Sequence, residues 1–175
     1  MSATLQLDVI VDFPAWLAAV PMVEALCRRS AVAAFDAAAP PLFQAGTEAE
    51  AEASVVLSND AHVKVLNAAW RGKDEATNVL AFPATDLTQA CPATQPPLMI
   101  GDVIVAFETA AAEATLEGKD LGDHLSHLVV HGMLHLLGYD HRTGSEAEEM
   151  ENVEVAVLAS LGVADPYSAV SIDPK

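Results

Sequence analysis

The chain has 175 residues, of which 52% are apolar, and it carries eight lysines and arginines against 25 aspartates and glutamates, a formal net charge of −17. This length and composition suit one globular domain with a buried core and exclude an intrinsically disordered chain. The acidic balance excludes binding of nucleic acid through a broad basic surface, although it leaves room for a small basic patch.

The N-terminal sequence and the cysteines indicate the cellular compartment of the protein. No apolar run is long enough for a membrane span, and the first residues, "MSATLQLDVIVDF", lack the pattern of a signal peptide. Cys27 and Cys91 lie far apart and in no C-x-x-C motif, so we expect two ordinary thiols. These features together predict a cytoplasmic protein with no membrane partner.

The first half of the chain alternates between strand and helix signals. We expect, in order, a strand over Thr4–Phe13, helical turns near Pro14 and Pro21, a helix over Met22–Ala38, a strand over Glu48–Ser58 and a helix over Ala61–Gly72. Asn59 or Asp60 can cap the last of these helices, and Gly72 can end it.

The second half begins with two strands and ends with three helices. The predicted order is a strand over Asn78–Pro83, a loop over Ala84–Leu98, a strand over Met99–Glu108, and helices over Thr109–Gly118, Leu121–Gly138 and Gly144–Gly162. Ser145 and Glu148 have the spacing of a capping box at the start of the last helix. This order predicts an α+β fold, with helices packed on a small mixed β-sheet. We expect a single domain over residues 1–165 and an irregular tail over residues 166–175.

Three of the six histidines lie in the stretch "HGMLHLLGYDH", His131 to His141. His131 and His135 are four residues apart, so a helix places both imidazoles on one face. Gly138 permits the chain to turn, and His141 can then approach the same point. Three imidazoles leave positions open on a bound metal ion, as in catalytic zinc sites, where the pKa of bound water falls and the water becomes a nucleophile. The stretch predicts a zincin-like metal-binding helix, with zinc as the expected ion and nickel or cobalt as alternatives.

Several polar residues near this stretch have two possible roles. His127 lies one turn before His131 and can be a fourth ligand, or it can pack and hydrogen-bond behind the metal. Asp140 can orient a ligand imidazole, or it can serve only to favour a turn. A solvated helix face is expected for Glu148, Glu149 and Glu151.

The histidine stretch resembles the metzincin protease motif H-E-x-x-H-x-x-G-x-x-H in the spacing of its histidines and its glycine. Gly132 stands where those proteases carry the glutamate that acts as general base. A metalloprotease would therefore lack its base here, and the sequence offers no other obvious general base.

A second group of candidate residues lies in "AAWRGKDEATNVLAFP", Ala68 to Pro83. Arg71 and Lys73 flank a glycine just before a predicted strand, and the guanidinium of arginine is suited to binding a phosphate or a carboxylate. Cations at the C-terminal end of a helix are also favoured by the helix dipole alone. By itself this stretch leaves both interpretations open.

Together the two stretches resemble the YbeY family of bacterial rRNA maturation factors, which are metal-dependent, single-strand-specific endoribonucleases. The family pattern H-G-x-L-H-L-x-G-Y-D-H is matched in full by "HGMLHLLGYDH". The upstream pattern R-G-x-x-x-x-T-[DN]-V-L-S-F-P is matched by "RGKDEATNVLAFP", with Ala81 in place of serine. The segments "GDVIV" (Gly101 to Val105) and "EEM" (Glu148 to Met150) match as well, and the resemblance covers Ser54 to Gly162.

The resemblance implies an activity and a set of residues that carry it. The zinc ligands would be His131, His135 and His141, and Arg71 would contact the scissile phosphate. Lys73, His127 and Asp140 are further candidates for substrate binding or for support of the ligands. The activity would be hydrolysis of RNA phosphodiester bonds in maturation of the 16S rRNA 3′ end and in ribosome quality control.

The partners implied are single-stranded RNA and rRNA, and not DNA. Because the chain has so few cations, we expect small-subunit ribosomal proteins and a ribosome-associated GTPase to help it dock. Two other functions stay open: a metalloprotease-like zinc hydrolase, and a non-catalytic ribosome-assembly factor whose metal is structural.

Overall fold

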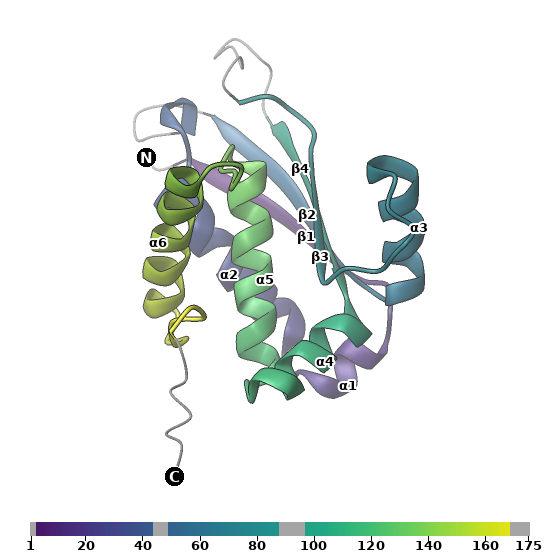
Figure 1. Cartoon of the computed structure of the whole chain (residues 1–175). Coiled ribbons are helices and arrows are strands. Elements are labelled where there is room, and N and C mark those ends of the chain that lie inside the picture. Colours follow the sequence, from purple (N-terminus) through teal and green to yellow (C-terminus); the bar gives the residue numbers. More distant parts are fainter. Residues whose placement is uncertain (1–2, 44–48, 88–96, 169–175) are drawn as a thin grey trace.

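The computed structural model describes residues 3–43, 49–87 and 97–168 (Figure 1). Four strands form one sheet in the order β1-β2-β4-β3. Their bounds are β1 (Thr4–Val11), β2 (Glu50–Ser58), β3 (Val79–Pro83) and β4 (Leu98–Ala106). β1 and β4 both run parallel to β2, whereas β3 runs antiparallel to β4. The sheet is therefore mixed, as predicted.

The helices lie on both faces of this sheet (Figure 1). Their bounds are α1 (Ala15–Ala19), α2 (Val23–Ala38), α3 (Asp60–Arg71), α4 (Phe107–Glu117), α5 (Leu121–Leu136) and α6 (Gly144–Ser160), with a 3₁₀ turn η1 at Pro41–Phe43. α2 and α5 cover one face and α6 packs outside them, whereas α3 lies on the opposite face. The α+β prediction is confirmed.

α5 is the central helix of the molecule, because it contacts β3, β4, α2, α4 and α6. Apolar side chains such as Leu125, Val129, Met133 and Leu134 are fully buried on it. A helix that is apolar on most sides must lie in the interior, since no single face could bury all of these side chains. The histidines near its C-terminal end are therefore carried by a helix that is packed on several sides.

Several predicted boundaries differ from the structure by one or two residues, among them the boundary between β4 and α4. The strand predicted to reach Glu108 ends at Ala106, and α4 begins at Phe107. The apolar run continues past the strand because the Phe107 ring packs edge-on against Trp16, at 5.0 Å between ring centroids. Apolarity alone therefore does not mark the end of this strand.

The capping box of α6 is formed by Thr143 and Glu146, so the prediction of Ser145 and Glu148 was wrong. The Thr143 hydroxyl accepts the Glu146 N–H at 3.2 Å, and the Glu146 carboxylate accepts the Thr143 N–H at 3.3 Å. Both pairs have the required spacing, but only Thr143 has the extended backbone of an N-cap.

The predicted N-cap and C-terminal end of α3 are confirmed. Asn59 caps α3 by accepting the His62 N–H at 2.9 Å, and Gly72 ends that helix with a φ of 69°. Cys27 is a buried free thiol, as predicted, whereas Cys91 lies outside the described residues. None of the helices in the described ranges combines the length and the apolar character needed to cross a bilayer.

Candidate metal centre and active site

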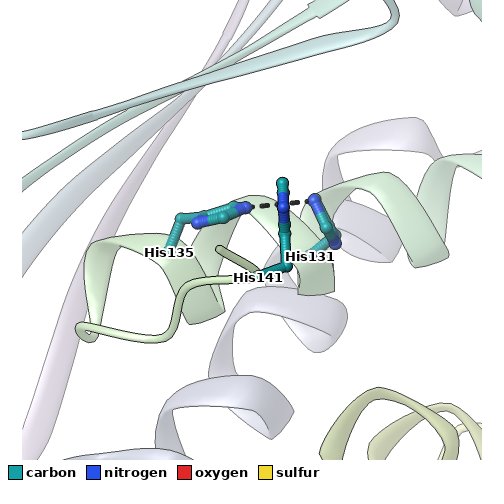
Figure 2. A group of neighbouring side chains, drawn as sticks. All are labelled: His131, His135 and His141. Carbon is teal, nitrogen blue, oxygen red and sulfur yellow. Dashed lines mark hydrogen bonds between the residues drawn. The ribbon is translucent and has the colours of Figure 1, made fainter. Parts of the chain in front are cut away.

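His131, His135 and His141 converge at the C-terminal end of α5 (Figure 2). His131 and His135 lie one turn apart on the helix, with 4.7 Å between their ring centroids. His141 comes from the segment after the helix, and its ring centroid lies 5.9 Å from that of His131 and 5.1 Å from that of His135. Each ring offers one nitrogen within 4.8 Å of the other two, so a single metal ion is within reach of all three.

A turn after α5 brings His141 back to the helix. Gly138 has a φ of 102°, a conformation that residues with side chains rarely adopt. Asp140 accepts the His141 N–H at 2.8 Å, and its other carboxylate oxygen pairs with Arg142 Nε at 2.7 Å. The hydrogen bond from His141 also lowers the pKa of Asp140 below its ordinary value. These contacts support the role of Asp140 in the turn.

Hydrogen bonds on the far side of two rings determine which nitrogens face the centre. His135 donates its Nδ1–H to the carbonyl of Tyr139 at 3.0 Å, and His131 donates its Nδ1–H to Glu154. In the neutral rings the lone pairs are therefore on the two Nε2 atoms, which lie 3.1 Å apart. Two such lone pairs repel at this distance unless a metal ion lies between them, or one ring carries a second proton and donates a hydrogen bond to the other, as the dashed line in Figure 2 draws it. The donor set therefore fits a bound metal ion.

The protonation state of His135 agrees with this fit. Burial lowers the pKa of His135 to about 4, because the charged ring is poorly solvated there. Electrostatic repulsion from the neighbouring imidazoles of His131 and His141 adds to this effect. At neutral pH the ring is therefore uncharged, which is the form that binds a metal.

Glu154 on α6 is a site residue that the sequence analysis missed. Its side chain is 0% exposed, and it accepts hydrogen bonds from His131, from His127 Nε2 at 3.3 Å and from the Tyr167 hydroxyl. Burial by itself raises the pKa of a carboxyl group, but the hydrogen bonds from these residues lower the pKa of Glu154 to about 2. A buried anion therefore lies directly behind His131.

A signal for Glu154 was present in the sequence. Met150, Val157 and Leu158 form the buried stripe of α6, and Glu154 lies within that stripe at helical spacing. A charged residue at a core position is almost always paired, so it indicates a partner that the sequence does not name. The exposed Glu148, Glu149 and Glu151 form the solvated face that was predicted.

His127 lies behind the three histidines rather than among them. Its ring packs edge-on against Tyr167, at 5.5 Å between ring centroids. His127, His131 and Glu154 also offer three ligand atoms within 4.8 Å of one another, but Glu154 already accepts three hydrogen bonds there. These contacts support the packing and hydrogen-bonding role of His127.

A cavity of about 600 Å³ opens beside the histidines, and Arg71 lines it together with them. The Arg71 Nη2 donates to the Ala81 carbonyl at 3.0 Å, and its guanidinium carbon lies 5.8 Å from the centre of the Phe82 ring. The Ala81 contact uses the backbone, so the replacement of the family's serine leaves it in place. The structure thus brings together the two stretches that the sequence analysis singled out.

The rest of the cavity lining comes from the same two stretches and from Arg142, directly after the second one. Its other lining residues are Thr77, Asn78, Val79, Ala81, Pro83, Gly132, Gly138, Tyr139, Asp140 and Arg142. Lys73 is exposed and lies outside this lining, with its backbone N–H bonded to the Asn67 carbonyl at 3.2 Å. The described cations on the cavity are therefore Arg71 and Arg142, and Arg142 is paired with Asp140.

The close packing of α5 on the sheet explains why position 132 is a glycine. A Cβ atom at Gly132 would lie 2.6 Å from Cγ1 of Val103, a buried β-branched residue of β4. The glutamate that metzincins use as general base has no room at this position. This packing weighs against the metalloprotease alternative.

A family model described as "Endoribonuclease YbeY" matches residues 29–162. The chain belongs to this family. A protein named Endoribonuclease YbeY from Paramagnetospirillum magneticum is 50% identical over 167 residues, which cover 95% of this chain and 98% of the relative. Another protein of that name, from Rhodopseudomonas palustris, is 46% identical over 164 residues, which cover 92% of this chain and 80% of the relative.

A solved structure shares the fold. The solution structure of TM1509 from Thermotoga maritima matches with a TM-score of 0.52 and 19% sequence identity, over 97% of this chain and all of that chain. At this identity the likeness concerns the fold alone. The resemblance noted in the sequence is thus confirmed as family membership.

Proposed function

We propose that this chain is a zinc-dependent endoribonuclease that hydrolyses phosphodiester bonds of single-stranded RNA. The observation that carries the proposal is one cavity lined by three histidines and by Arg71, in a chain of the YbeY endoribonuclease family. His131, His135 and His141 would hold the zinc ion. The substrate would be rRNA, at the 3′ end of the 16S molecule and in ribosome quality control.

Of the residues around the cavity, the three histidines would bind the metal and Arg71 would bind the substrate. A bound zinc ion supplies Lewis-acid chemistry, which stabilises charge on a phosphoryl oxygen and lowers the pKa of water. Arg71 would bind the phosphate, because its guanidinium lies on the cavity and offers donors beyond the one bonded to Ala81. The chain would act as one domain over residues 1–165, in the cytoplasm.

Docking on the ribosome would need help from partners. The charge of −17 opposes a polyanion, and only two described cations lie on the cavity. Small-subunit ribosomal proteins and a ribosome-associated GTPase are the partners that we propose.

The test is cleavage of a labelled single-stranded RNA by the zinc-loaded protein and by variants purified identically. Arg71→Ala should keep its zinc and its thermal stability but lose about 10²- to 10³-fold in cleavage rate, the loss expected for one charge-stabilising donor. Arg29→Ala removes another exposed cation, on α2, and should cleave normally. His135→Ala should lose zinc and cleavage together.

Two results would contradict the proposal. Normal zinc content and full cleavage in His135→Ala would remove the histidine centre from the reaction. No cleavage by the zinc-loaded wild type, together with a lower melting temperature after chelation, would favour the assembly factor with a structural metal.

A further inference from the structure

The two tryptophans of this chain have opposite environments. Trp16 is 0% exposed and donates its Nε1–H to the Ser58 carbonyl at 2.9 Å. Trp70, in the last turn of α3, is 73% exposed. A tryptophan usually buries most of its ring, because the ring is one of the largest apolar surfaces that a side chain offers. Trp70 therefore presents an aromatic face that the described residues leave uncovered.

The position of Trp70 connects it to the cavity. Its ring centroid lies 6.4 Å from that of Phe82, with an angle of 61° between the rings, so the two meet edge to face. The same Phe82 ring lies 5.8 Å from the Arg71 guanidinium carbon. Trp70 and Arg71 thus flank one ring of β3, and Arg71 continues into the cavity.

The charge around Trp70 differs from that of the molecule as a whole. Lys64, Arg71 and Lys73 lie on α3 or directly after it, and they are three of only eight lysines and arginines in the chain. Lys64 is weakly paired with Asp74, at 3.9 Å, and both of these side chains are at least half exposed. With Asp60, Asp74 and Glu75, residues 60–75 are formally neutral, whereas the whole chain carries −17.

We propose that Trp70 is a stacking platform for one unpaired nucleobase of the RNA whose phosphate is bound at Arg71. This inference rests on the proposed function and adds a subsite to it. An aromatic ring beside a cation is the arrangement by which proteins bind single-stranded nucleic acid: the base stacks on the ring and the phosphate pairs with the cation. A base inside a duplex has no free face, so this subsite selects for single strands.

The test uses the intrinsic fluorescence of the zinc-loaded protein, since Trp70 is the exposed tryptophan and Trp16 is shielded. A single-stranded RNA hexamer should quench wild-type emission, and the same hexamer paired with its complement should not. Trp70→Phe should lose the quenching but keep most of the affinity, because a phenyl ring also stacks. A gel run after each titration shows whether the hexamer is intact.

Affinity is measured separately, by the anisotropy of a labelled hexamer. Trp70→Ala should weaken binding about tenfold, which corresponds to the loss of one stacked base. Leu116→Ala is the matched control: Leu116 is 88% exposed at the end of α4 and lies outside the cavity lining, so its removal should leave the affinity unchanged.

The outcomes separate this inference from the proposed function. Cleavage of RNA by the wild type without quenching, and with equal affinity in Trp70→Ala, would overturn the stacking platform and leave the nuclease intact. Quenching without cleavage would support the platform and contradict the nuclease. Equal quenching by the duplex, or no binding at all, would overturn the platform.

Discussion

The imidazole of His131 is oriented by a carboxylate from another helix. Glu154 comes from α6, 23 residues later in the chain, and is itself held by Tyr167 and His127. A buried anion at Nδ1 keeps the lone pair of His131 on Nε2, toward His135, and raises the basicity of the ring. We therefore expect Glu154 to position His131 for metal binding.

Glu154→Gln tests this role because it keeps the size of the side chain and removes its charge. We expect the zinc affinity to fall about 10- to 100-fold, as when other outer partners of metal-binding histidines are replaced. The measurement is competition with a chromogenic chelator. Glu151→Gln, on the exposed face of the same helix, is the control. Equal dissociation constants for the two variants would show that Glu154 has no part in zinc binding.

At the scale of single elements, the start of α6 is fixed by the capping box of Thr143 and Glu146. The Thr143 hydroxyl and the Glu146 carboxylate satisfy two backbone N–H groups that the helix would otherwise leave unpaired.

Thr143→Ala should lower the free energy of unfolding by about 1 kcal/mol, the usual cost of losing an N-cap side chain. Urea denaturation measures this change. Ser145→Ala is the control, since Ser145 is exposed in the first turn and does not cap the helix. A larger loss in Ser145→Ala than in Thr143→Ala would mean that the capping box is the pair predicted from the sequence.

The contact between α5 and β4 depends on the absence of a side chain at position 132. Gly132→Ala should reduce the stability by about 1–2 kcal/mol, because overpacking against Val103 outweighs the higher helix propensity of alanine. The unfolding midpoint in urea reports the loss. Gly144→Ala, where no atom lies within 4 Å of an added Cβ, should unfold at or above the wild-type midpoint. If Gly132→Ala were as stable as wild type, the packing would not explain the missing glutamate.

At the scale of the whole molecule, the charge of −17 limits how RNA can bind. Each phosphate neutralised on a single strand contributes about −0.7 to the slope of log affinity against log salt concentration. If Lys64, Arg71 and Lys73, on α3 or directly after it, are the cations that meet the phosphates, we expect a shallow slope of about −2. Titrations of a labelled hexamer at several salt concentrations measure it. A slope steeper than about −4 would require a basic surface beyond these three residues.

The outline of the fold could be predicted from the sequence because its signals are local. Gly72 and Asn59 bound α3 through backbone conformation and one side-chain bond, and neither depends on distant residues. The boundary at Phe107 could not be predicted in the same way, since this residue continues the apolar run of β4. Its contact with Trp16, which is far away in the sequence, exists only in the folded chain.

The sequence by itself determined that His131 and His135 share a helix face and that Gly138 lets the chain turn, because helical periodicity and glycine's freedom act over a few residues. Only the tertiary structure decided that Glu154 orients His131 and that Arg71 lines the cavity of the histidines. The first contact joins α6 to α5, and the cavity brings the end of α3 to the histidines of α5; both arrangements are set by how the helices pack on each other and on the sheet. The spacing of residues along the chain does not specify such packing.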